Sequence, residues 1–526
     1  MTHRTPHRIA GAPTRRRGRL VGAIAVLVAA SVALSGCLYS MIPESSPSST
    51  ASLAPDVTGI DPALVPYYAQ TLSWSPCSGG FDCTTVRAPL DWADPSAGDL
   101  SLSVIRHRAS SGTAKGSLLT NPGGPGASGV SLIRDSLSFA VGAALQQDYD
   151  VIGFDPRGVG ASTAVTCLDP TAMDAYLFAI PPGARGSDAW NADLQARDKT
   201  FAEACQANSG GILGYITTDN SARDMDLLRG VLGDAKLNYL GYSYGTFLGA
   251  TYAKLFPERV GRLVLDGAID PSISGLDVGT TQGVGFESAL RAYMADCQQG
   301  GSCPFRGTVD EGMADLGTLL ASVDRSPLPA TDGRRLGANA LLTSIVSALY
   351  SKDSWSYLTT ALSDALRGNP DVAFQLADFY YSRSGSSYSD NSTEAFTAYN
   401  CMDYPGPPTQ AQQDAANALL AEKAPTVAPY WQGSDTCAAW PFPPTGIREP
   451  ISADGAAPIV VIGTTNDPAT PYEWSVSLAA QLSSGVLITR VGEGHTGYNK
   501  GNACVDAAVE SYFVDGTVPQ NGLRCG

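Results

Sequence analysis

A serine flanked by two glycines, at a junction between a strand-like run and a helix-like run, constrains this chain more than any other feature. Residues 241–245 read Gly-Tyr-Ser-Tyr-Gly, after the apolar run 237–241 and before a helical pattern that ends near Phe256. The turn is so tight that side chains at the two glycine positions would collide with the neighbouring strand and helix. The strained serine then projects its hydroxyl at the edge of a sheet. Ser243 is therefore the candidate nucleophile.

Short apolar runs alternate with helical patterns on both sides of this junction. Strands are expected over residues 100–108, 116–120, 149–154, 237–241, 262–266, 458–463 and 486–491, and helices over 130–141, 221–232, 246–256 and 505–513. Strands that alternate with helices form a mostly parallel sheet with helices on both faces. The expected fold class is therefore α/β.

The alternation stops near Pro271 and resumes only at residue 458. The segment between is richer in Ser, Ala, Asp and Tyr and has the patterns of helices and loops. One α/β domain with a mainly helical insertion explains this arrangement most simply. The predicted parts are a first core segment over 58–271, the insertion over 272–456 and a second core segment over 457–526.

The first 36 residues have the pattern of a secretory signal peptide. An uncharged run over 20–34 ends at Leu34-Ser-Gly-Cys37 and follows six arginines: Arg4, Arg8, Arg15, Arg16, Arg17 and Arg19. The run is short for a membrane span. Its ending resembles the lipobox of bacterial lipoproteins, so the prediction is export and a lipid anchor on Cys37 at the cell membrane. The alternative is a soluble secreted protein cut nearby. Residues 37–57, rich in Ser, Pro, Thr and Ala, are expected to form a flexible tether.

The charge of the chain argues against nucleic-acid binding. The formal net charge is −16, and loss of the six leader arginines takes it to −22. A protein that binds nucleic acid needs basic surface to release counterions from phosphates. Solubility outside the cell is the simpler meaning of the acidic composition.

Ten of the eleven cysteines remain when Cys37 is set aside. An even number in an exported chain predicts disulfides. Spacing does not fix their connectivity, but clustering favours Cys77–Cys83, Cys167–Cys205, Cys297–Cys303, Cys401–Cys437 and Cys504–Cys525. Zinc sites use Cys and His at short fixed spacings. The sequence has no Cys-x-x-Cys and no paired His, so neither a metal nor another cofactor is expected.

A serine hydroxyl needs a base, and histidine is the usual one. The sequence has four histidines, and His3 and His7 belong to the predicted leader. His107 lies within a predicted strand before Ser243, where strand packing explains it. His495 lies in a glycine-rich loop after the last apolar strand. In the order nucleophile, acid, histidine that is typical of the α/β-hydrolase fold, this loop carries the base.

The acid is expected at the end of the preceding strand, where Asp467 follows 458–463. Open parallel sheets place their sites at this edge, and the carboxylate would hold the tautomer of the imidazole. Glu493 is the competing carboxylate and is expected to be solvated. Thr470 is predicted to be the N-cap of a capping box with Glu473 at N3. A role for Thr470 in positioning Asp467 is the secondary alternative.

Acyl transfer also needs hydrogen-bond donors for the oxyanion. The glycine-rich turn 121–126 follows a predicted strand, at the position of the first donor. Gly124 is assigned, with Gly123 as the alternative, and the amide of Tyr244 is the second donor. A second turn, 155–162, lacks the Gly-x-Gly-x-x-Gly spacing and any lysine. It is interpreted as structural, with Arg157 paired to a carboxylate.

These motifs together resemble the actinobacterial tripeptidyl aminopeptidase family, relatives of prolyl iminopeptidase. The resemblance runs from about Trp74 to the C-terminus and rests on Gly-Gly-Pro-Gly (123–126), Asp-Pro-Arg-Gly-x-Gly-x-Ser (155–162), Gly-Tyr-Ser-Tyr-Gly-Thr (241–246), Asp-Pro-Ala-Thr-Pro (467–471) and Gly-x-Gly-His-Thr (492–496). It implies an α/β-hydrolase fold with 272–456 as a cap. The chain departs from prolyl iminopeptidases at Asn121-Pro122, where those enzymes have histidine.

The resemblance also implies a serine exopeptidase that releases short peptides such as tripeptides from free N-termini. In such enzymes carboxylates of the cap bind the α-ammonium of the substrate. Residues 398–403 resemble the family's Cys-x-Asp motif, so Asp403 is the candidate. The alternative for Asp403 is a structural role beside a disulfide.

Two other functions fit the same residues. An esterase or lipase would use the same triad, because fold and nucleophile do not choose the acyl group. A lipid-tethered binding protein without catalysis is the third possibility. The expected partners are peptides with a free N-terminus, with membrane contact only through the anchor and no nucleic acid.

Overall fold

The computed structural model describes residues 54–431 and 435–526. The predicted signal peptide over 1–36 and the predicted lipid anchor at Cys37 lie outside these residues, as does most of the predicted tether. No helix in the described part of the chain is long and apolar enough to cross a membrane.

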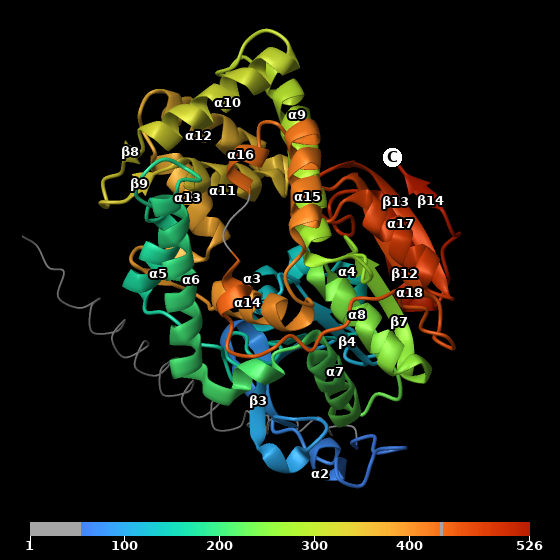
Figure 1. The fold of residues 1–526 in the computed structure, drawn as a ribbon. Coiled ribbons are helices and arrows are strands. Elements are labelled where there is room, and N and C mark those ends of the chain that lie inside the picture. The colour runs from blue at the N-terminus through green and yellow to red at the C-terminus, as the bar shows by residue number, and fades with distance from the viewer. Residues whose placement is uncertain (1–53, 432–434) are drawn as a thin grey trace, which may run out of the picture. The chain divides into compact units, whose positions relative to one another are not determined.

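A ten-stranded sheet forms the centre of the described residues (Figure 1). Its order is β1 (Ser75–Cys77), β2 (Phe81–Pro89), β3 (Asp99–His107), β5 (Asp150–Phe154), β4 (Ser117–Asn121), β6 (Leu237–Tyr242), β7 (Val260–Asp266), β12 (Ile459–Asn466), β13 (Gly485–Glu493) and β14 (Leu523–Cys525). Neighbours from β5 to β14 pair in parallel, and the first three strands join in antiparallel fashion. The predicted mostly parallel sheet is confirmed.

Successive residues of the parallel strands point into two separate cores, because side chains alternate between the faces of a sheet. Leu119 packs in one core with Met225 of α7 (Thr218–Leu232) and Tyr252 of α8 (Tyr244–Leu255). Its neighbour Leu118 packs in the other core with Ile133 of α3 (Gly129–Ala140). That second core also includes α4 (Ala143–Asp148) and α18 (Ala503–Asp515), whereas α17 (Tyr472–Gln481) joins the first. Because side chains on both faces of these strands are buried, their sequences are continuous apolar runs.

The chain between β7 and β12 is mainly helical, as predicted for residues 272–456. It forms α9 (Gly275–Gln299), α10 (Val309–Arg325), α11 (Ala338–Leu349), α12 (Trp355–Leu366), α13 (Asp371–Tyr380), α14 (Ser392–Asp403), α15 (Gln410–Lys423) and α16 (Ala428–Trp431), with the hairpins β8 (Leu328–Pro329) to β9 (Arg335–Leu336) and β10 (Arg383–Ser384) to β11 (Ser387–Tyr388). Helices α9 to α13 share a core of their own. Figure 1 shows α10 to α13 in the upper part of the view, away from the ten-stranded sheet, with the short strands β8 and β9 beside them.

Two helices from before the nucleophile also contact the insertion. They are α5 (Pro170–Phe178) and α6 (Asp188–Ser209), and Phe178 packs into the core of the insertion. Arg185 forms an ion pair with Asp324 at 2.6 Å. Asp174 forms another with Arg383 at 2.7 Å. The helices α5 and α6 and the chain between them therefore pack with the insertion, although the boundaries predicted from the sequence place them in the first core segment.

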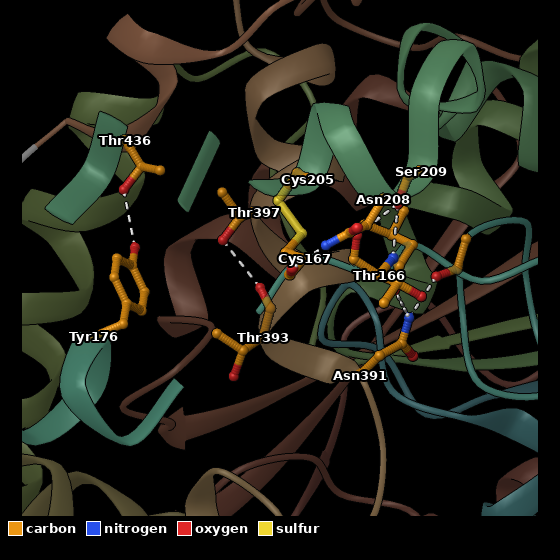
Figure 2. Close-up of a disulfide and its surroundings, with 12 residues drawn as sticks. Thr166, Cys167, Tyr176, Cys205, Asn208, Ser209, Asn391, Thr393, Thr397 and Thr436 are labelled. Carbon is orange, nitrogen blue, oxygen red and sulfur yellow. Dashed lines mark hydrogen bonds between the residues drawn. A yellow bond between two sulfur atoms is a disulfide. The ribbon is translucent and has the colours of Figure 1, made fainter. Parts of the chain in front are cut away.

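All five disulfides favoured by the clustering of cysteines are present. Figure 2 shows Cys167–Cys205, which ties the chain after β5 to α6. Beside it, the side chain of Asn208 donates to the carbonyl of Cys167 at 2.7 Å, and the amide of Thr166 donates to the hydroxyl of Ser209. The loop that follows β5 is therefore held by a covalent bond and by hydrogen bonds.

Arg157 pairs with a carboxylate, as predicted for the turn after β5. Its Nε and Nη2 donate to the two oxygens of Asp224 on α7, both at 2.7 Å. Both side chains are fully buried. Carbonyls of Pro89, Leu90 and Tyr215 accept the remaining guanidinium bonds, so the pair joins separate segments of the chain.

Candidate active site

The turn between β6 and α8 has the strained geometry expected of a nucleophile elbow. Ser243 lies at φ +56°, in the left-handed region that side chains rarely adopt. A Cβ at Gly241 would lie 2.5 Å from the carbonyl oxygen of Gly245, and a Cβ at Gly245 would lie 2.9 Å from Oδ1 of Asn121. The amide of Ser243 donates to the carbonyl of Asp266 at 2.9 Å. The neighbouring backbone thus explains both glycines.

Asp467 and His495 are in direct contact although 28 residues separate them in sequence. Nδ1 of His495 lies 2.9 Å from each carboxylate oxygen of Asp467. The carboxylate is buried and also accepts the amides of Ala469, Thr470 and Thr496. These bonds fix the carboxylate, which in turn holds the imidazole with Nε2 facing away from it. Nε2 is buried and has no hydrogen-bond partner among the described residues.

Thr470 contacts the Asp467–His495 pair. The predicted capping box, with Thr470 as N-cap and Glu473 at N3, is wrong. Its hydroxyl donates to Oδ2 of Asp467 at 3.1 Å and lies 3.2 Å from Nδ1 of His495. Helix α17 has Pro471 at its N-cap position and no side-chain cap. The hydroxyl bonds to the buried carboxylate because that acceptor is close and charged, so the secondary alternative for Thr470 is the one observed.

The end of β7 and the residue after it contact both the turn of Ser243 and His495. The carbonyl of Asp266 accepts the amide of Ser243, and the next residue, Gly267, lies against His495. A Cβ at Gly267 would lie 3.1 Å from Cε1 of His495 and 3.0 Å from Oγ1 of Thr470. Since β6, β7, β12 and β13 are consecutive in the sheet, the three predicted residues follow neighbouring parallel strands at their carboxyl ends.

The glycine-rich turn after β4 packs against the nucleophile. A Cβ at Gly123 would lie 2.8 Å from Cβ of Ser243. The amide of Gly123, the alternative donor for the oxyanion, already donates to Oδ1 of Asn121 at 2.9 Å. The amides of Gly124 and Tyr244 have no hydrogen-bond acceptor within residues 54–431 and 435–526. The amides of both assigned donors are therefore unengaged.

The two competing residues lie in other surroundings. His107 is opposite Val151 in the pairing of β3 with β5, at the amino ends of the parallel strands. Burial lowers the pKa of His107, and its ring packs against Phe81. Glu493 is partly exposed and accepts a hydrogen bond from the side chain of Asn466. Neither residue contacts the Asp467–His495 pair.

Asp403 lies at the C-terminal end of α14 and is buried. Its carboxylate accepts the amide of Thr218 at 2.9 Å and the hydroxyl of Thr218 at 2.6 Å. That hydroxyl lies 2.5 Å from the hydroxyl of Tyr244, the residue after the nucleophile. Burial raises the pKa of Asp403 to about 6. Asp403 thus links the insertion to the elbow through Thr218 and Tyr244.

Three residues outside the motifs are not identified from the sequence, two of them in contact with the site and the third, Glu394, on α14. Tyr350 packs edge-on against the imidazole of His495 with 5.3 Å between ring centroids, and its carbonyl accepts the amide of His495. Glu394 is a buried carboxylate in the first turn of α14, and burial raises its pKa to about 7. Asp266 is buried at the end of β7. A charge that ends a buried strand is a usable signal for Asp266, whereas nothing local marks Tyr350 or Glu394.

Comparisons with known proteins agree with this arrangement. A sequence model of the α/β-hydrolase family described as TAP-like protein matches residues 424–525. Serine protease Hip1 of Mycobacterium tuberculosis is 34% identical over 88% of this chain and 92% of its own length. Carboxylesterase B of the same species is 37% identical over 84% of this chain and 86% of its own. Tripeptidyl aminopeptidase of Streptomyces lividans is 31% identical, covering 86% of each chain. The chain therefore belongs to the tripeptidyl aminopeptidase family of serine hydrolases with the α/β-hydrolase fold.

Proposed function

We propose that this protein is an exported serine exopeptidase that releases short peptides from free N-termini. The observation that carries the proposal is the Asp467–His495 pair together with the strained Ser243, whose turn and the histidine loop are both bonded to Asp266. Ser243 would attack the scissile carbonyl while Nε2 of His495 takes its proton. Asp467 would hold the imidazole and stabilise the imidazolium. The amides of Gly124 and Tyr244 would donate to the oxyanion.

His495 would give this proton to the leaving amine, whose departure leaves the acyl-enzyme on Ser243. His495 would then take a proton from the attacking water and return it to Ser243 as the peptide is released. Thr470 lies within contact of both other members of the triad and would fix their relative orientation. Each part uses only residues of this chain, without a metal or another cofactor.

We further propose that residues 272–456, with α5 and α6 beside them, form a cap that selects peptides with a free amine. Contacts of Tyr350 with His495 and of Gln282 with the carbonyl of Ala469 support a position over the site. Two buried carboxylates on α14 would attract an ammonium group. Asp403 already accepts two bonds from Thr218, whereas Glu394 bonds only to its own amide.

The Streptomyces and mycobacterial relatives named as peptidases support the substrate class. The five disulfides support export, since such bonds persist in oxidising compartments. We propose attachment to the cell membrane through lipid on Cys37, with the soluble secreted form as the alternative.

An esterase is the second candidate, because a relative at 37% identity is named carboxylesterase B. The test compares a tripeptide and a short acyl ester, each linked to the same chromogenic leaving group. We expect cleavage of the tripeptide with an unblocked amine and much slower cleavage of its N-acetylated twin. Cleavage of the ester alone would favour the esterase. A wild-type protein that cleaves none and is not labelled by a fluorophosphonate would favour the non-catalytic binding protein.

A further inference from the structure

Asp266 ends β7, the strand between the nucleophile strand β6 and the acid strand β12. The loop after β7 therefore lies between the two halves of the proposed machinery. Asp266 is fully buried, and the proposed mechanism gives its side chain no role. A buried carboxylate without an ionic partner costs free energy and needs an explanation.

The main chain and the side chain of Asp266 bind different catalytic loops. Its carbonyl accepts the amide of Ser243 at 2.9 Å. Its carboxylate accepts the amide of Gly497 at 2.8 and 3.0 Å and the amide of Tyr498 at 2.8 Å. These amides follow His495 by two and three residues. One residue thus fixes the nucleophile turn and the histidine loop to each other.

The charged and titratable groups that face Asp266 come from two elements. His495 and Lys500 lie on the loop after β13, and Tyr242 ends β6. Burial raises the pKa of Asp266 to about 6, while the amides of Tyr498 and Gly497 and the charges of His495 and Lys500 oppose this shift. Burial lowers the pKa of Lys500 to about 8. An ionised Asp266 is therefore a second negative charge, besides Asp467, that favours the protonated imidazole.

We propose that Asp266 is a positioning residue, which holds the histidine loop in register with the nucleophile and whose charge stabilises the imidazolium of His495. The proposal rests on the proposed role of His495 as base. Neutral side chains could also accept two amides, so loop anchoring alone does not require the charge. The charge becomes useful when the imidazolium forms during proton transfer.

The test is the second-order rate of fluorophosphonate labelling, measured against pH for wild type and Asp266→Asn. Labelling reports attack by the serine whether the natural substrate is a peptide or an ester. The variant lacks the negative charge that favours the protonated imidazole, so its acid limb should move to lower pH. The plateau rate should fall about 10- to 100-fold, because the imidazolium is less stabilised.

Asp234→Asn is the matched control. Like Asp266, Asp234 accepts a backbone amide with its carboxylate, in this case from Ser117, the first residue of β4. Burial raises the pKa of Asp234 to about 6 as well. It lies at the opposite edge of the sheet, where β4 begins. Its variant should label at the wild-type rate with an unchanged pH profile. A general loss of stability would affect both variants alike.

The outcomes separate this inference from the proposed function. Folded Asp266→Asn with an unchanged rate and profile, in a wild type that labels, would overturn the positioning role alone. A wild type that does not label would overturn both proposals. If Asp266→Asn does not fold, Asp266→Ser is the second variant, because its neutral hydroxyl can also accept a backbone amide. A folded Asp266→Ser that labels at the wild-type rate would overturn the role of the charge.

Discussion

At the residue scale, the site is built from polar side chains that end buried strands. Asp266 ends β7, Asp467 follows β12 and His495 follows β13, and each is fixed by backbone amides or by a neighbouring carboxylate. Backbone amides are suited to fixing these side chains because the sheet itself holds the backbone in place. The chemistry of the site therefore depends on the rigidity of the sheet edge.

Removal of the base should abolish turnover. His495→Ala and Ser243→Ala should each lower kcat by about 10³-fold or more, since members of a triad act as a unit. The measurement is steady-state hydrolysis of a chromogenic peptide. His107→Ala is the control and should retain activity, because His107 lies at the other edge of the sheet. Near-normal kcat for His495→Ala would show that another residue is the base.

The hydroxyl of Thr470 should contribute to catalysis and not to substrate binding. Thr470→Val removes its bond to Asp467 and its contact with His495 while keeping the shape of the side chain. We expect kcat to fall about 10-fold, equivalent to the ~1.4 kcal/mol of one hydrogen bond to a charged group, with KM unchanged. Thr464→Val, which loses a bond only to the carbonyl of Thr496, is the control. A change in KM alone would refute the assignment.

The sequence identifies the three candidate residues that follow neighbouring strands of the sheet, but not their surroundings. Ser243, Asp467 and His495 follow from one motif, the order of three residues and the small number of histidines. The error at Thr470 has a local cause. Thr-Pro-x-Glu fits a capping box, but the hydroxyl bonds to a buried carboxylate that the local pattern does not include. Tyr350 reaches His495 from a helix more than a hundred residues away, so only the fold brings it there.

At the scale of elements, the strands and helices of the core were predictable because each carries its own pattern. Two-faced burial makes β4, β5 and β6 continuous apolar runs, and the elbow fixes the junction of β6 with α8. Helix α6 was missed, since its sequence is mostly polar and it is stabilised by contacts with distant elements. Tertiary contacts outweigh local pattern there.

The buried ion pair between Arg157 and Asp224 should be essential to the packing of α7 against the sheet. Asp224→Ala leaves a buried guanidinium without its partner, which costs about 3–5 kcal/mol. Denaturant unfolding should show this loss. The double variant Arg157→Met, Asp224→Leu should recover much of it, because neither charge then needs a partner. Equal stability of the single variant and wild type would contradict a structural role for the pair.

At the scale of the whole molecule, the composition and the cysteines point to a protein outside the cytoplasm. All five disulfides lie within the described residues, and Cys37 is the one cysteine of the sequence that they leave over. We propose that this remaining cysteine carries the lipid. The insertion has its own hydrophobic core. With the lipid in the membrane, it would meet substrates outside the membrane surface.

The anchor can be tested on the intact protein expressed in its exporting host. Wild type should partition into detergent and carry the added mass of acyl chains, and Cys37→Ala should remain in the aqueous phase. Ser35→Ala keeps Cys37 and the small-residue ending, so it should partition like wild type. A wild type found in the aqueous phase, with the mass of an unmodified chain, would favour the soluble secreted form.

The most direct test of the central claim is mass analysis of the products from one unblocked polypeptide and its N-acetylated twin. We predict stepwise release of short peptides from the unblocked N-terminus, no release from the acetylated twin and no release by Ser243→Ala. Internal fragments from both substrates, or equal cleavage of the two, would contradict an exopeptidase that recognises a free amine.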